Sequence, residues 1–233
     1  MDKKQGRRSA EDALKTKAEI LEVAGQLFSQ YGYKKVSLRQ ISEIAGVSHS
    51  LLRYHFGSKE KVWQQISDDI YHHFQNYFQY LLGTLPHQLP PNVKLYMMMN
   101  RVLAYSLNDP RAIKFLADAV QQEKEMVNYF LEPNRKDSEI LNALMEEFKQ
   151  QQPTATVTLG ELRWQAAMFS HGASTLEPLM LHAFENESRD SALFRHWQTF
   201  SQMIAVQLLV EKEYIETPQS LTEMIVPPQN CFS

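Results

Sequence analysis

Residues 37–59, SLRQISEIAGVSHSLLRYHFGSK, constrain the fold of this chain more than any other stretch. Ser37 is a favourable helix N-cap, and Gln40 follows at the spacing of a capping box. Gly46 tolerates a positive φ and is typical of a helix end, and Ser48 can cap a second helix at once. Only about three residues then join the two helices, and a join this short forces a steep crossing. The stretch therefore predicts a helix-turn-helix.

The second helix of this pair is short and polar on its outer side. Either Leu51 or Leu52 faces the core. The expected outward residues are Ser48, His49, Ser50, Arg53 and Tyr54. In a helix-turn-helix the second helix enters the DNA major groove, so these side chains are candidates for DNA contact.

A longer helix is expected before this pair and another after it. Apolar side chains recur at helical spacing from about Asp12 to Tyr31, and Gly32 then ends the helix. Ser58 is the expected N-cap of a helix that continues to about residue 82. The predicted core of the three-helix domain is Leu27, Phe28, Ile41, Leu52 and Phe56.

The rest of the sequence predicts further helices separated by prolines, glycines and polar caps. The expected spans are 92–107, 110–129, 138–151, 159–184 and 190–215, with Asp137 or Ser138 as the cap of the third. No alternating strand pattern longer than a few residues occurs, so the fold class is predicted to be all-α. The expected divisions are a flexible basic arm at 1–12, a helix-turn-helix domain at 13–57, a connecting helix at 58–82, a larger helical domain at 83–216 and a loose tail at 217–233.

The charges divide the chain in the same way. Residues 1–62 carry 12 Lys and Arg against 7 Asp and Glu, whereas residues 63–233 carry 12 against 20. A basic head on an acidic body is expected when only the head binds a polyanion, although chance clustering would produce the same asymmetry. The single cysteine, Cys231, excludes an internal disulfide framework. Because the N-terminus lacks a secretory h-region and no apolar run reaches the ~18–20 residues of a membrane span, we expect a cytoplasmic protein.

The run of residues 41–48, followed by residues 52–60, resembles the N-terminal signature of TetR/AcrR-type bacterial transcriptional regulators. Many positions agree in one register with the pattern IAxxAGVSxxxLxYxF-x-SK, and the match covers roughly residues 14–65. The resemblance implies a DNA-binding regulator, with a repressor released by a small molecule as the main expectation. An activator, a ligand-independent regulator and a head that binds protein instead of DNA are the alternatives.

The same resemblance assigns DNA-contacting roles residue by residue. Phosphate contacts fall to Ser37, Ser48, Tyr54, His55 and Lys59, of which Tyr54 and His55 could instead be packing residues. Base contacts fall to Arg39, His49, Ser50 and Arg53. An arginine can bind guanine bidentately, which makes Arg39 the strongest candidate base reader. Arg53 stands where the family commonly has an aromatic residue, so it either binds a phosphate or reads a base.

The larger domain is expected to hold an effector pocket. Candidate lining residues combine apolar bulk with a few polar groups, although the same helical spacing also describes an ordinary core. They are Tyr96, Met97, Arg101, Tyr105, Phe115, Trp164, Met168 and His171.

The resemblance also implies a homodimer formed by the last two long helices. The candidate interface residues are Leu162, Ala166, Phe169, Ala173, Leu176, Phe200, Met203, Ile204, Gln207 and Leu208. Burial of these faces within one chain is the competing interpretation. The expected partners are therefore a palindromic double-stranded DNA operator, a small-molecule effector and a second copy of the chain.

No pattern predicts catalysis, a cofactor or a metal site. His72 and His73 are adjacent and point in different directions on a helix, and His171, His182 and His196 lack the spacing of a helical zinc pair. A Gly-rich phosphate loop, G-x-S-x-G and H-E-x-x-H are all missing from the sequence. We therefore expect no enzymatic activity.

Overall fold

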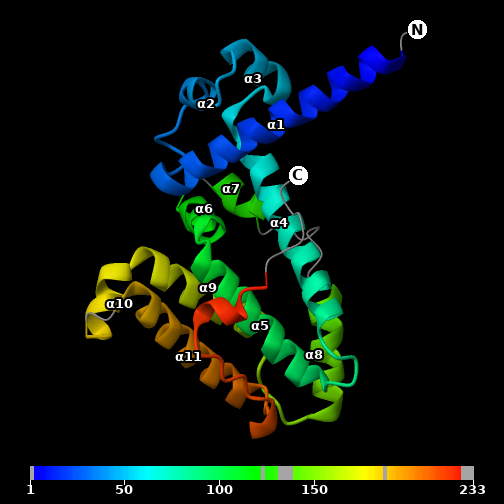
Figure 1. Cartoon of the computed structure of the whole chain (residues 1–233), viewed down its shortest axis with the longest axis vertical. Helices are drawn as coiled ribbons and strands as arrows, with labels where there is room; N and C mark the ends of the chain where they lie inside the picture. The colour runs from blue at the N-terminus through cyan, green and yellow to red at the C-terminus, as the bar shows by residue number, and fades with distance from the viewer. Residues whose placement is uncertain (1–2, 122–123, 131–138, 186–187, 227–233) are drawn as a thin grey trace. The chain divides into compact units, whose positions relative to one another are not determined.

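The computed structural model describes residues 3–121, 124–130, 139–185 and 188–226, and these residues form helices and turns without a β-strand (Figure 1). The fold is all-α, as predicted. The helices divide into two compact units. Among the described residues, the first unit holds 3–72, 115–121 and 124–130, and the second holds the remainder. Two of the boundaries between the units fall inside helices, α4 (Lys59–Thr84) and α6 (Arg111–Val120).

The first unit is built on α1 (Lys3–Tyr31), α2 (Leu38–Ile44) and α3 (His49–Phe56). Helix α2 packs against both α1 and α3, and Figure 1 shows the three helices together in blue and cyan. Residues 3–12, expected to be a flexible arm, belong to α1. Four of these ten residues are Lys or Arg, which are good helix formers, and this is consistent with the earlier start.

The core of the first unit contains all five predicted residues, Leu27, Phe28, Ile41, Leu52 and Phe56. It is completed by residues from farther along the chain. Trp63 of α4 stacks on Phe115 of α6 at 5.4 Å between ring centroids, and Met126 of α7 (Lys124–Phe130) is buried beside them. Phe115, predicted to line an effector pocket in the larger domain, lies instead in the core of the first unit.

The second unit is arranged around α5 (Pro91–Asn108). This helix packs against α8 (Glu139–Gln151), α9 (Leu159–Thr175) and α11 (Arg189–Gln207), as Figure 1 shows. The short helix α10 (Glu177–Ala183) packs on α9 and α11. Because α5 has neighbours on several sides, most of its surface is buried.

Three of the predicted helices are interrupted. The helix expected over 110–129 stops at the end of α6, and α7 begins at Lys124. The helix expected over 159–184 is broken between α9 and α10, where Pro178 occupies the first turn of α10. The helix expected to reach residue 215 ends after Gln207, and Leu209 then adopts a φ of 53°. The proposed caps at residues 137 and 138 lie outside the described residues.

The described part of the predicted tail, residues 217–226, contains a short 3-10 helix, η2 (Leu221–Met224). Another, η1 (Lys212–Tyr214), lies between α11 and the tail. Helix η2 packs on α5 and α11, and Met224 is buried. Residues 227–233, including Cys231, lie outside the described part. None of the described helices is long and apolar enough to cross a membrane.

Candidate DNA-binding site

The turn between α2 and α3 is set by local hydrogen bonds. The Ser37 hydroxyl accepts a hydrogen bond from the Gln40 amide at 3.2 Å, and the Ser48 hydroxyl accepts one from the Leu51 amide at 3.1 Å. Between the two helices Gly46 has a φ of 66°, a conformation that favours glycine. The predicted N-caps and the turn glycine are therefore confirmed.

Helix α3 has one buried face and one exposed polar face. Leu52 and Phe56 are buried, whereas Leu51 is exposed, so Leu52 is the core residue of the two alternatives. The exposed polar side chains of α3, which we call the recognition face, are His49, Ser50, Arg53 and Tyr54. Tyr54 is 84% exposed, which removes the interpretation of this residue as a packing residue. The recognition face is thus exposed to solvent in the described part of the chain.

Arg39 lies on the exposed side of α2 and is held by an acidic neighbour. Its Nε donates a hydrogen bond to Oε1 of Glu43 at 2.8 Å, and both side chains are largely exposed. This hydrogen bond and the charge of Glu43 raise the pKa of Arg39 above its ordinary value. Arg39 is thus a surface cation whose present partner is one turn along the same helix.

Lys59, expected to contact a phosphate, has a different environment. Its Nζ donates hydrogen bonds to the main-chain oxygens of Tyr33 and Val36, both at 3.0 Å, and lies 4.1 Å from the centroid of the Tyr33 ring. Partial burial lowers the pKa of Lys59. Lys59 therefore fastens the loop before α2 to the start of α4. His55 is also partly buried, with its ring 5.5 Å from that of Tyr54.

A residue from much later in the chain supports the same loop. The Asp118 carboxylate of α6 accepts a hydrogen bond from the Tyr33 amide at 2.7 Å. Next to it Gly32 has a φ of 81°, and a Cβ there would lie 2.6 Å from Oδ1 of Asp118. Sequence reasoning missed Asp118, because no local pattern signals a contact across 85 residues.

The residues predicted to line an effector pocket lie in several different surroundings. Tyr96 is buried with its hydroxyl 2.8 Å from that of Ser201, and Arg101 is paired with Glu216 at 2.9 Å. Trp164 is 66% exposed. Of the other candidates in the second unit, Met97 and Tyr105 are half-buried against the core, whereas Met168 is exposed. His171 forms a hydrogen bond with the Thr175 hydroxyl within α9.

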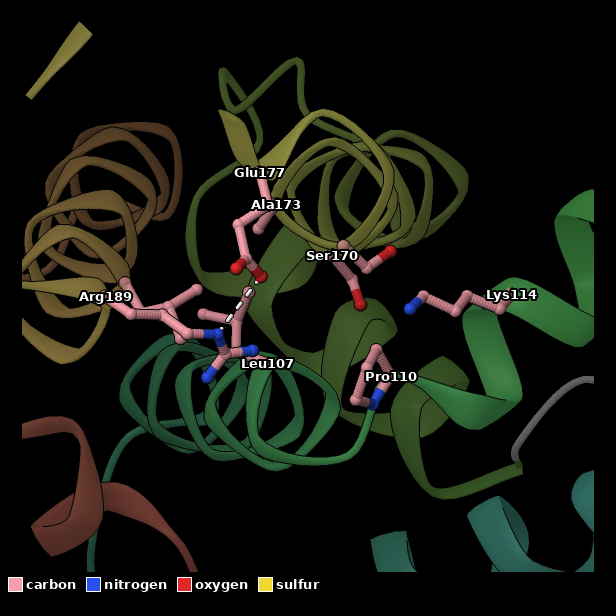
Figure 2. Close-up of a pocket in the computed structure, with 9 residues that line it drawn as sticks. Leu107, Pro110, Lys114, Ser170, Ala173, Glu177 and Arg189 are labelled. Carbon is pink, nitrogen blue, oxygen red and sulfur yellow. Dashed lines mark hydrogen bonds and ion pairs between the residues drawn. The ribbon is translucent and has the colours of Figure 1, made fainter. Parts of the chain in front are cut away.

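Two cavities of the second unit were not anticipated. Figure 2 shows the smaller one, of about 30 Å³, with the ion pair of Glu177 and Arg189 on one side and Ser170 and Lys114 on the other. It has room for about one water molecule and is too small for an effector. The larger is a groove of about 500 Å³ between the start of α11 and residues 219–225. Neither cavity is lined by a predicted effector residue.

Half of the predicted dimer interface is buried inside one chain. Leu162, Ala173, Phe200, Ile204 and Leu208 belong to the core of the second unit. The competing interpretation is correct for these five, because α9 and α11 turn this stripe toward each other and toward α5. Ala166, Phe169, Met203 and Gln207 are half-buried, and Leu176 is exposed. In the described part of the second unit, the exposed large apolar side chains are Trp164, Met168, Leu176, Leu179, Val206 and Leu209.

Within the described ranges, no group of three or more His, Cys, Asp or Glu side chains is placed to hold a metal ion.

Comparison with known proteins adds a family relationship for the first unit. Residues 20–66 match the profile of the family described as bacterial regulatory proteins, tetR family. The chain is 34% identical over 65 residues to the HTH-type transcriptional regulator TtgR of Pseudomonas putida, covering 28% of this chain and 31% of TtgR. It is 46% identical over 61 residues to the regulator RutR of Escherichia coli, covering 26% of this chain and 28% of RutR. The similarity thus spans less than a third of either relative.

Solved structures resemble this chain over a greater length. A TetR transcription regulator from Haloarcula marismortui aligns with a TM-score of 0.55 at 12% identity, covering 83% of this chain and 96% of the other. PfmR, a TetR family regulator from Thermus thermophilus, aligns with a TM-score of 0.51 at 21% identity, covering 83% and 99%. At these identities the likeness concerns the fold alone.

Proposed function

Because its N-terminal domain places this chain in the TetR family of bacterial regulatory proteins, we propose that it is a sequence-specific DNA-binding transcriptional regulator. The observation that carries this proposal is the recognition face. Four neighbouring side chains with hydrogen-bonding groups are exposed on a short helix whose opposite side is anchored by Leu52 and Phe56. A helix of this kind, held by a tight turn, is suited to the DNA major groove.

The proposed contacts divide into two classes. The Ser37 and Ser48 hydroxyls lie at helix N-termini, where hydroxyls and main-chain amides can bind phosphate, and exposed Tyr54 can do the same. Arg39, His49, Ser50 and Arg53 are the proposed base-contacting residues, with Arg53 and Arg39 long enough to reach guanine edges. We assign Lys59 to support of the loop before α2 and leave it out of the direct contacts.

We propose that two copies of the chain bind a palindromic operator. The exposed apolar residues on and next to α9, α10 and α11 support this, because these helices pack on one another and apolar residues gathered on one surface commonly mark an interface. Trp164→Arg should shift the protein toward monomer in sedimentation velocity. Leu14→Arg, which changes an equally exposed apolar residue of α1, is the matched control and should leave the assembly unchanged. The same monomer–dimer distribution in both variants would show that Trp164 of α9 does not belong to the interface.

The second unit is the proposed site of effector binding and dimerisation. Helix α4 gives Trp63 to the core of the first unit and Tyr77 to that of the second. A rearrangement of the second core would therefore move a helix that also belongs to the first. An effector that binds the DNA-incompetent state more tightly would release the operator, as in a repressor. We further propose that the protein acts in the cytoplasm and has no catalytic role.

Selection of bound sites from a random pool of double-stranded DNA at physiological salt tests the DNA-binding proposal. An inverted repeat is the expected result, and affinity for it should fall steeply with salt because several phosphates are contacted. Recovery of no motif by folded, dimeric protein would contradict sequence-specific binding. Weak dependence on salt would favour a head that binds protein.

A further inference from the structure

The chain after α11 returns across the core of the second unit. Residues 212–226, which we call the C-terminal strap, contain η1 and η2. The strap inserts Met224 into the core and packs against α5 and α11. It therefore occupies volume between helices that a ligand could otherwise use.

Polar side chains of α4 and α5 hold the strap at both ends. Oε1 of Glu216 lies 2.9 Å from Nη2 of Arg101, and the Glu216 amide donates a hydrogen bond to the Tyr96 hydroxyl at 3.3 Å. At the other end the Tyr77 hydroxyl donates to the main-chain oxygen of Val226 at 2.9 Å. The strap is thus held by a few specific contacts at its ends.

The ion pair that anchors the strap is buried and incompletely satisfied. The side chains of Arg101 and Glu216 are only 18% and 15% exposed. In the part of the chain that the structure describes, Oε2 of Glu216 and Oδ1 of Asn100 are buried without a hydrogen-bond partner. Burial also raises the pKa of the Glu216 carboxyl, against the influence of Arg101. A buried ion pair contributes little net stability, because desolvation of the two charges offsets their attraction, so exchange of Glu216 for another carboxylate that also pairs with Arg101 should cost little.

Without the strap, the donors around Glu216 would remain in place. Nη1 of Arg101 donates a hydrogen bond to the main-chain oxygen of Met97 at 3.1 Å, which orients the guanidinium. The Asn100 amide and the Tyr96 hydroxyl both lie within hydrogen-bond distance of Ser201 Oγ, at 3.2 and 2.8 Å. A guanidinium and hydroxyls in otherwise apolar surroundings suit a carboxylate.

We propose that the C-terminal strap is a displaceable internal occupant of the effector site, and that the effector is a small carboxylate with an apolar body. The effector carboxylate replaces that of Glu216 at Arg101, and its apolar part takes the space of Met224. This inference rests on the effector-binding part of the proposed function. The strap competes with the effector within the same molecule. The apparent affinity for the effector is therefore the intrinsic affinity multiplied by the fraction of molecules whose strap is displaced.

Calorimetric titration with octanoate and phenylacetate tests the proposal, with octanamide and phenylacetamide as neutral matches. Glu216→Ala removes the internal carboxylate, so it should bind at least one of the two acids tenfold or more tightly than the wild type does. The amides should gain less, because they lack the charge that pairs with Arg101. Glu213→Ala, which removes an exposed carboxylate from the same strap, should behave as the wild type. Equal affinity of Glu216→Ala and wild type for both acids, including no binding by either, would overturn the proposal.

Two further measurements test the proposal even if Glu216→Ala fails to fold. Arg101→Met combined with Glu216→Ala leaves no unpaired charge, and it should lose the preference for acids over amides. In the wild type, saturating acid should increase hydrogen exchange in residues 216–226, because the strap leaves its site. Retained preference in the double variant, or unchanged exchange of the strap, would contradict displacement. These experiments contain no DNA, so their failure is separate from failure of site selection.

Discussion

Nε of Arg39 lies 2.8 Å from Oε1 of Glu43, its neighbour one turn along α2, and the two side chains are 83% and 62% exposed. An ion pair this exposed contributes little to stability, so its partners can be exchanged at small cost. Guanine edges and phosphates would compete with Glu43 for the guanidinium. The pair therefore orients the side chain of Arg39, a proposed base-contacting residue, and DNA can replace Glu43 as its partner.

Glu43→Gln should strengthen operator binding by about twofold to fivefold, because it removes the competing carboxylate of an exposed pair. Fluorescence anisotropy with labelled operator measures the change. Glu19→Gln is the matched control, since Glu19 forms an exposed pair with Lys15 on α1 at the same helical spacing. An equal gain in both variants would assign the effect to net charge instead of Arg39.

Arg39→Ala should relax sequence preference. If Arg39 binds a guanine, the variant should lose about 1–3 kcal/mol of discrimination at one base pair of each half-site. Competition titrations with operator and with single-base variants measure this loss. Equal weakening on operator and random DNA would instead identify Arg39 as a phosphate contact.

Lys59→Met should destabilise the first unit by about 1 kcal/mol, because two main-chain oxygens lose a charged donor in a partly exposed setting. Urea unfolding measures the difference, with exposed Lys61→Met as the control. We expect the slope of DNA affinity against salt to remain as in the wild type. A slope reduced by about one charge would restore Lys59 as a phosphate contact.

Gly32→Ala should cost more stability than Gly46→Ala. Both glycines have a positive φ, which costs alanine about 1–2 kcal/mol. Only at Gly32 would the new Cβ also meet a neighbour, Oδ1 of Asp118 at 2.6 Å. The extra cost should shrink when Gly32→Ala is measured in an Asp118→Ala background. Equal costs at the two glycines in thermal unfolding would show that the Asp118 side chain moves aside freely.

Acid should destabilise the second unit through His73. This residue is buried, and its ring is stacked on that of Tyr77 with 6.3 Å between the ring centroids. Burial lowers the folded-state pKa of His73, whereas the nearby charge of Asp109 acts to raise it. The unfolded chain therefore takes up the proton first. The contribution of His73 is fully present above its ordinary pKa of 6.5 and is lost as the pH falls from there toward the folded-state pKa.

His73→Phe should reduce this loss, as measured by urea midpoints at pH 7.5 and pH 5.5. His182→Phe, at an exposed position of α10, is the control and should keep the wild-type difference between the two midpoints. An unchanged difference in His73→Phe would show that other groups dominate the acid response.

The geometry of the helix-turn-helix could be predicted because it depends on short-range interactions. A hydroxyl at Ser37 or Ser48 reaches an amide three residues away, and Gly46 satisfies a backbone angle at its own position. The apolar pattern likewise placed Phe56 and either Leu51 or Leu52 on the inward side, and the structure selects Leu52. The recognition face follows from these local signals.

The interior of the second unit could not be predicted in the same way. The sequence shows that α9 and α11 are apolar on more than one side, but the packing on α5 decides which side is covered. Leu162 and Phe200 therefore lie in the core, while Trp164 and Val206 remain outside. Helical periodicity gives the direction of a side chain relative to its own axis and says nothing about the neighbour it meets.

By itself the sequence determined an all-α chain whose head has the caps, turn and exposed polar residues of a helix-turn-helix. Only the tertiary structure joined Phe115 to Trp63, Asp118 to Tyr33 and Glu216 to Arg101. These pairs are separated by 52, 85 and 115 residues along the chain. The physical reason is that caps and turns are local properties of the backbone, whereas such contacts exist only after several helices have packed together.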